Sequence, residues 1–346
     1  MKKLFALMLL CTTVAFAGCS KDDNNNEQPE PEPKITDRFQ NEDQVDGSTS
    51  EKAYIIKNAE QLTLLAERMN GEDGAKWRDK CYKMVNDIDF GTEEVEWEPI
   101  APSGMKIDGM RPMATFCGEF DGGNYTIKGK LLFSGNGNKG IFASLNYGGK
   151  VKNLRIEGQM RGSASGRSLG VIVGSMSGGS VIHCHNAAEF IAEGTYIGGI
   201  VGICSTIEGN YKNEVIACTN TGTISSKSFQ GSEGAIVGSI LYGTVIGCIN
   251  KGEVVNACSI VGYGNGNQIP SCCWSSASTL RNGFVSFKHS YFKKIEGSTG
   301  QDEETVFSGS HPTAEQITDM NTAWQKADAA CEYQFNAITG EIEKKP

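Results

Sequence analysis

The sequence predicts an all-β protein, a right-handed parallel β-helix with short helical or irregular caps at both ends. Glycine makes up 43 of the 346 residues and proline only 9, so we expect many short strands joined by tight turns. An Ile-Val-Gly triplet occurs four times, each time followed by a β run that ends near a cysteine. Units of three short strands bury their apolar faces only by stacking on their neighbours, which favours a solenoid.

The repeat has four blocks, and the fourth is degenerate. From the triplet glycine to the cysteine there are 10 positions in three blocks and 16 in the second, where residues 207–213 form an expected loop insertion. A β-propeller blade would need four longer strands in roughly 40 residues. The triplets are 172–174, 200–202, 236–238 and 260–262, and the β runs are 181–186, 215–220, 245–250 and 269–272.

Strand alternation predicts which side chains face the interior. It places Ile182, Cys184 and Asn186 inside and His183 and His185 outside. The pattern Ile-x-Cys-x-Asn recurs, so we expect an asparagine stack bonded from coil to coil and an internal column of thiols. The expected members are Asn186, Asn220 and Asn250, and Cys184, Cys218, Cys248 and Cys272.

The segments that flank the coils of residues 113–300 are predicted to be caps. In residues 51–112, Asn58 with Gln61 forms a capping box that opens a helix over 59–69, which Asn70 and Gly71 should end. In residues 301–346, Thr313 with Gln316 opens a second helix with one apolar face, made of Ile317, Met320 and Trp324. Caps of this kind protect open strand edges.

The N-terminus has the order of a secretory signal peptide over residues 1–18. Two lysines precede the apolar run 4–16, which is too short to span a bilayer, and a small-residue site follows. The segment 16–19 resembles the lipobox of bacterial lipoproteins, which implies that Cys19 is lipidated. A plain secretory signal with an incidental cysteine is the alternative.

Residues 19–50 are predicted to be a disordered tether, because their first part is polar and proline-rich. A lipidated cysteine followed at once by Lys21 and acidic residues is similar to the surface-export signal of Bacteroidota lipoproteins. That resemblance implies a lipid-anchored protein of the outer membrane, exposed on the cell surface. A solubilising spacer before a periplasmic protein is the alternative.

The net charge excludes general nucleic-acid binding. It is −9 for the whole chain and −11 without residues 1–18, which hold two lysines and no acid. No second apolar run is long enough to cross a membrane, so we expect the lipid to supply the membrane contact.

The order of the blocks resembles the GLUG-type repeats of bacterial adhesin-like surface proteins. An earlier coil carries Gly140–Ala143 and Val151–Ile156, and the later coils follow the pattern G-I-V-G … C-x-N-x-G. The pair Ala187 and Ala188 departs from that pattern. The resemblance covers most of residues 51–340 and implies adhesion at the cell surface. Its upstream segments are 53–62, 86–89, 97–100 and 116–122.

Two pairs of side chains have metal-like spacing. His183 and His185 could share one face of a strand, but no outward carboxylate repeats beside them, so we expect two solvated histidines. Asp87 and Asp89 could hold Ca²⁺, but such a pair more often accepts backbone N–H bonds. We therefore expect no metal and no cofactor. The glycine-rich stretch 262–267 is interpreted as a turn, because no helix follows it.

The alternative function is a polysaccharide lyase or glycoside hydrolase on the same scaffold. Such enzymes need clustered acids, yet residues 122–301 contain no aspartate, and the glutamates of the repeats occur singly. No Gly-x-Ser-x-Gly motif stands at an expected strand-to-helix turn, and Cys184 and Cys218 are expected in the interior, so a serine or cysteine nucleophile has no support either. We therefore expect no catalytic residue. These glutamates are Glu189, Glu193, Glu208, Glu214, Glu233 and Glu253.

Binding is the remaining class, and exposed aromatic side chains at turns are its candidates. Ring faces of this kind stack on sugars or on a protein partner. We expect a non-enzymatic, adhesin-like binding or surface-structural protein whose ligand is a glycan or a surface protein. The candidate binding residues are Tyr196, Tyr211, Tyr242, Tyr263 and Trp274, with Tyr147 and Phe229 as further exposed rings.

Overall fold

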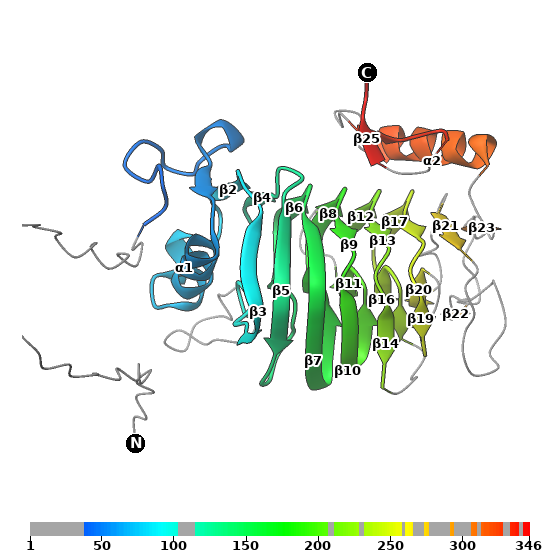
Figure 1. Ribbon diagram of the computed structural model, residues 1–346, viewed down its shortest axis with the longest axis horizontal. Coiled ribbons are helices and arrows are strands. Elements are labelled where there is room, and N and C mark those ends of the chain that lie inside the picture. The colour runs from blue at the N-terminus through cyan, green and yellow to red at the C-terminus, as the bar shows by residue number, and fades with distance from the viewer. Residues whose placement is uncertain are drawn as a thin grey trace, which may run out of the picture. The chain divides into compact units, whose positions relative to one another are not determined.

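Short parallel strands stack coil upon coil into a β-solenoid of about six turns, as the sequence predicts (Figure 1). The computed structural model describes residues 38–102, 115–206, 211–227, 232–257, 260–265, 273–276, 291–293, 306–309, 313–327, 333–338 and 342–346. The predicted signal peptide, Cys19 and most of the predicted tether lie outside the described residues, as do Phe229 and Cys272. Residues Thr36–Pro346 belong to one compact unit.

One sheet has 11 strands, all paired in parallel. In spatial order it contains β1 (Tyr54–Ile56), β2 (Cys81–Met84), β4 (Glu119–Asp121), β6 (Phe142–Lys152), β8 (Val173–Ile182), β11 (Val201–Thr206), β16 (Val237–Ile240), β20 (Val261–Asn265) and β22 (Tyr291–Lys293), and β12 (Glu214–Ile216) and β17 (Thr244–Ile246) continue from β8.

The second sheet has 12 strands and is also parallel throughout. Its path is β19 (Val254–Val255), β14 (Ile224–Ser226), β10 (Glu189–Gly198), β7 (Arg155–Gly170), β9 (His185–Asn186), β13 (Thr219–Asn220), β18 (Ile249–Asn250), β21 (Cys273–Ser276) and β23 (Val306–Gly309), with β3 (Ile88–Glu96), β5 (Thr126–Phe133) and β15 (Glu233–Gly234) paired beside it.

The core is a set of rows in which each coil contributes one side chain. One row runs through Tyr82, Phe120, Val151, Val181 and Val215, which occupy equivalent register positions and are almost fully buried. Each coil therefore covers the apolar face of its neighbour, which is the source of stability that the repeat predicts.

The predicted asparagine stack is confirmed. Asn186 Nδ2 donates to Asn220 Oδ1 at 2.8 Å, and Asn220 Nδ2 donates to Asn250 Oδ1 at 2.9 Å. All three amides are buried, so the ladder satisfies polar groups that water cannot reach.

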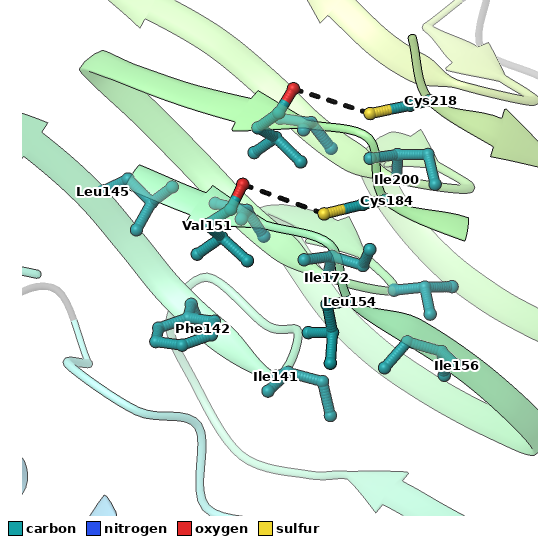
Figure 2. Packing of buried hydrophobic residues seen from close by; sticks show 14 of the residues in the cluster. Ile141, Phe142, Leu145, Val151, Leu154, Ile156, Ile172, Cys184, Ile200 and Cys218 are labelled. Atoms are coloured by element: carbon teal, nitrogen blue, oxygen red, sulfur yellow. Dashed lines mark hydrogen bonds between the residues drawn. The ribbon is translucent and has the colours of Figure 1, made fainter. Parts of the chain in front are cut away.

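The cysteines that follow the β runs are buried, as predicted. Cys184 and Cys218 have free thiols, which donate to the carbonyl oxygens of Val151 and Val181 on the preceding coil at 3.7 and 3.5 Å (Figure 2). Cys248 Sγ bonds Val215 O in the same way, at 3.6 Å. The thiols thus lie one above another inside the coils.

The predicted alternation over residues 182–186 is wrong at its first two positions. His183 has φ +54° and is 7% exposed, whereas Ile182 points outward and is partly buried. The left-handed residue inserts a corner between two strands, so Val181 and Cys184 both face inward although they are three positions apart. Asn153, Ala217 and Gly247 form the same corner on other coils, with φ of +55°, +52° and +62°.

Both predicted helix starts are confirmed. α1 (Ala59–Asn70) begins after Asn58, whose Oδ1 accepts from Gln61 N at 3.0 Å, and ends at Gly71. α2 (Ala314–Ala327) begins at a reciprocal capping box between Thr313 and Gln316. The described 3₁₀ turns are Ser50–Lys52 and Gly74–Lys76.

α2 packs on the outer flank of the coils. Figure 1 shows the helix lying along the coils. Its Ile317 and Met320, with Phe335 of β24 (Tyr333–Phe335), form one buried apolar cluster with Ile216 and Ile249. Ile182 and Ala217 belong to the same apolar cluster. β24 pairs antiparallel with β25 (Ile342–Lys344), and Asn321 bonds both backbone groups of Phe335.

Candidate functional site

Three of the exposed tyrosines lie at one corner of the solenoid. Tyr147 and Tyr211 are each 49% exposed and Tyr242 is 46% exposed. Tyr147 lies within β6, Tyr211 between β11 and β12, and Tyr242 between β16 and β17, which are equivalent places on different coils. We call Tyr147, Tyr211 and Tyr242 the tyrosine corner.

A glycine supports the Tyr211 ring. Gly148 has φ +86°, and a Cβ placed on it would be 2.7 Å from Tyr211 Cε1 and 2.9 Å from Cδ1. The ring therefore lies directly over the backbone of Gly148, although one coil lies between the two residues. Gly178, on the coil between them, also has a positive φ and no side chain that could block the ring.

Asn213 ties the corner together. It is fully buried; its Oδ1 accepts from Gly178 N and its Nδ2 donates to Tyr242 O, both at 2.7 Å. Gly243, with φ +134°, packs so closely on Asn213 that a Cβ would be 2.3 Å from the Asn213 carbonyl oxygen. One amide thus joins three successive coils, which holds the loops of Tyr211 and Tyr242 in fixed positions.

A polar row runs beside the tyrosine corner. Lys150, Ser180, Glu214 and Thr244 occupy one register position on four successive coils. They point outward, because the residue after each of them is buried in the core. Along the row an ammonium group is followed by a hydroxyl, a carboxylate and a second hydroxyl, and Ser180 Oγ donates to Glu214 Oε2 at 3.0 Å. We call these four residues the polar row.

The structure separates the other candidate aromatic residues from this corner. Tyr196 is half-buried on β10 of the second sheet, paired with Ser168. Tyr263 is half-buried on β20, between Ser239 and Tyr291. The backbone of Trp274 pairs with Ile249, and its side chain lies outside the described part.

Sequence reasoning missed Gly148 and Asn213 as parts of the site. The available signal was the longer spacing in the second block, which marks the insertion that ends at Asn213. A glycine after an exposed tyrosine gives no such signal, because its contact is two coils away.

The two histidines are not solvated, which corrects the expectation. His183 Nδ1 donates to Asn153 Oδ1 at 2.7 Å, and Asn153 Nδ2 donates to Asp121 Oδ1 at 2.9 Å. His185 bonds Thr219 and Thr221 through its two ring nitrogens. Burial lowers the pKa of both histidines to about 4, and the charge of nearby Arg155 adds to the effect.

Asp87 and Asp89 act as acceptors. Asp87 Oδ1 accepts from Thr126 N and Asp89 Oδ1 accepts from Gly91 N, both at 2.8 Å, and Asp89 also pairs with Lys128 at 3.1 Å. Within the described ranges, no three His, Cys, Asp or Glu side chains lie close enough to hold a metal ion.

Two carboxylates of β4, Glu119 and Asp121, share one lysine. Glu119 bonds Ser50 and Lys152 at 2.8 Å each, and Asp121 is 3.7 Å from the same lysine. Burial raises the pKa of Glu119, but the bonds from Lys152 and Ser50 outweigh burial and lower it. Such a carboxyl is ionised at neutral pH and holds no proton to donate.

Two of the buried thiols, Cys184 and Cys204, are unsuited to nucleophilic chemistry. Burial raises the pKa of both, so the reactive thiolate is disfavoured at these two positions.

No described helix is long and apolar enough to cross a membrane.

The fold and its corner define a class, a parallel β-solenoid with aromatic side chains on its flank. No protein-family model and no curated protein matches the chain. A solved structure of a candidate immunoglobulin A1 protease from Bacteroides ovatus is similar, with a TM-score of 0.54 and 19% identity over 86% of this chain and 94% of that one. At this identity the likeness shows the fold alone.

Proposed function

We propose that the protein is a non-enzymatic, adhesin-like binding protein, anchored outside the cell by lipid on Cys19, which binds its ligand at the tyrosine corner. The observation that carries the proposal is the corner itself. Three half-exposed rings project from different coils, and the buried Asn213 fixes two of their loops. Half-exposed aromatic rings on a rigid support lose little conformational entropy when a ligand covers them.

The location outside the cell is inferred from the N-terminal sequence. A lipobox-like segment precedes Cys19, and a polar, proline-rich stretch follows it. One lipid-modified cysteine and a flexible tether would leave the solenoid exposed to ligands, and many copies on one cell would add avidity to a weak single site.

Enzymatic activity has less support than binding. Two carboxylates of β4, Glu119 and Asp121, both pair with Lys152. The protease name of the similar Bacteroides structure belongs to that protein, and 19% identity does not transfer it.

The first prediction tests the corner. Replacing Tyr147, Tyr211 and Tyr242 together with alanine should weaken the binding of cells that display the protein to an array of purified polysaccharides and mucin by about tenfold or more, because each lost ring removes stacking area. The matched control is Tyr125→Ala, since Tyr125 is also exposed, at 37%, but lies outside the corner.

Circular dichroism should be unchanged in both variants, because none of the four rings is in the core. Full binding by a folded triple variant would contradict the proposal. Cleavage of a saccharide that one Glu→Gln change abolishes would replace it with the enzyme alternative.

A further inference from the structure

The tyrosine corner and the polar row are parallel lines on the flank of the solenoid. The corner extends over four successive coils, from Tyr147 to Tyr242. Since neighbouring strands are about 4.8 Å apart, its length is roughly 14 Å. The polar row extends over the same four coils, immediately beside the corner.

Building on the proposed binding function, we propose that this surface binds an extended saccharide chain that lies along the stacking direction of the coils. The apolar faces of successive sugar rings pack on Tyr147, Tyr211 and Tyr242. Their hydroxyl groups bond the polar row, which offers the ammonium group of Lys150 as donor, the carboxylate of Glu214 as acceptor, and the hydroxyls of Ser180 and Thr244, which can donate or accept. A line of rings beside a line of mixed polar groups matches a ligand that is apolar on one face and polar at its rim.

Two features disfavour an extended peptide as the occupant. β6, β8 and β12 each pair with a strand on both sides, so none of these three offers a free edge for an added strand. The line beside the tyrosines is polar rather than an apolar groove, so it offers no side-chain pocket for an amphipathic helix.

Gly148 is a positioning residue in this arrangement. A Cβ on Gly148 would be only 2.7 Å from Tyr211 Cε1, so the ring and a side chain at this position could not both keep their places. Alanine at this position would displace the Tyr211 ring from its place beside Tyr147 and Gly148, without removing any aromatic side chain.

The chain contains a matched control for this substitution. Gly91 has φ +81°, close to the +86° of Gly148, but a Cβ on Gly91 would meet nothing within 4 Å. Gly148→Ala and Gly91→Ala therefore impose similar backbone strain, and only the first displaces a ring.

The second prediction uses the purified full chain and an array of neutral, uronic-acid and amino-sugar polysaccharides. For a polymer that is retained, affinity should rise about tenfold or more from fragments of two sugars to fragments of six, because longer fragments reach more rings. Gly148→Ala should weaken the six-sugar fragment roughly threefold to tenfold, and Gly91→Ala less than about twofold.

Several results would overturn the saccharide proposal while leaving the binding function intact. These are a corner-dependent protein ligand with no retained polysaccharide, an affinity already maximal at two sugars, and equal effects of the two glycine variants. Loss of the binding function is a different result, in which the triple tyrosine variant keeps every interaction of the wild type.

Discussion

Among single residues, His183 shows how one backbone corner changes an environment. Its φ of +54° turns the imidazole onto Asn153, where burial and the charges of Arg155 and His185 lower its pKa to about 4. In the unfolded chain the pKa is near 6.5. Between pH 6.5 and 4, His183 is therefore protonated in the unfolded state but remains neutral in the folded state.

The third prediction follows from this difference. The stability supplied by neutral His183 is complete above pH 6.5 and should fall by up to about 3 kcal/mol as the pH drops to 4. His183→Asn should reduce this pH-dependent loss of unfolding free energy, because asparagine does not titrate. The substitution should be tolerated by the backbone, since Asn153 already adopts the same left-handed conformation. Urea unfolding at several pH values measures it, and an unchanged slope in the variant would contradict the assignment.

The sequence predicts some of these residues correctly and others not, for one physical reason. Asn186 and Cys184 repeat at fixed positions, so their interior place can be deduced from spacing. Ile182 lies before the left-handed corner, and strict alternation applied across that corner assigns it to the wrong face. A positive φ at histidine or alanine has no sequence signature comparable to glycine.

Among the elements, α2 was predictable in its start but not in its contacts. The reciprocal bonds of Thr313 and Gln316 are local, so four residues are enough to predict the helix start. Its packing partner is an apolar patch on the coils, in which Ile182 and Ile216 lie just before the left-handed corner and Ile249 lies just after it. Ile182 and Ile216 face outward only because of that corner. The tyrosine corner was likewise not predictable from local sequence, because it joins residues of different coils.

The fourth prediction tests the docking of α2 with two adjacent residues of β12. Ile216→Asp places a charge against α2, so α2 and β24 should lose about 2 kcal/mol or more of protection against hydrogen exchange while the coils keep theirs. Val215→Asp places the same charge in the core and should destabilise the coils themselves. Equal loss in both regions for Ile216→Asp would show that α2 is not a separate layer.

For the molecule as a whole, the repeat predicts the fold class because each coil needs its neighbours. Four imperfect blocks are sufficient to predict parallel stacking, and the confirmed asparagine ladder has the register that the spacing implies. Ligand identity is different, because it depends on surface side chains that face solvent and have no periodic constraint. The structure contributes their relative positions, and from these the tyrosine corner and the polar row emerge.

The last prediction concerns the anchor. Cys19→Ala should move the protein from the membrane fraction to the soluble fraction, because without a thioether-linked lipid only a polar tether would remain at the N-terminus. Sedimentation of membranes followed by immunoblotting measures the change, and protease digestion of intact cells tests separately whether the wild type is displayed on the surface. Ser20→Ala, next to the anchor, should leave the distribution unchanged. A Cys19→Ala protein that has lost its signal peptide and still sediments with membranes would show that lipid on Cys19 is not the anchor.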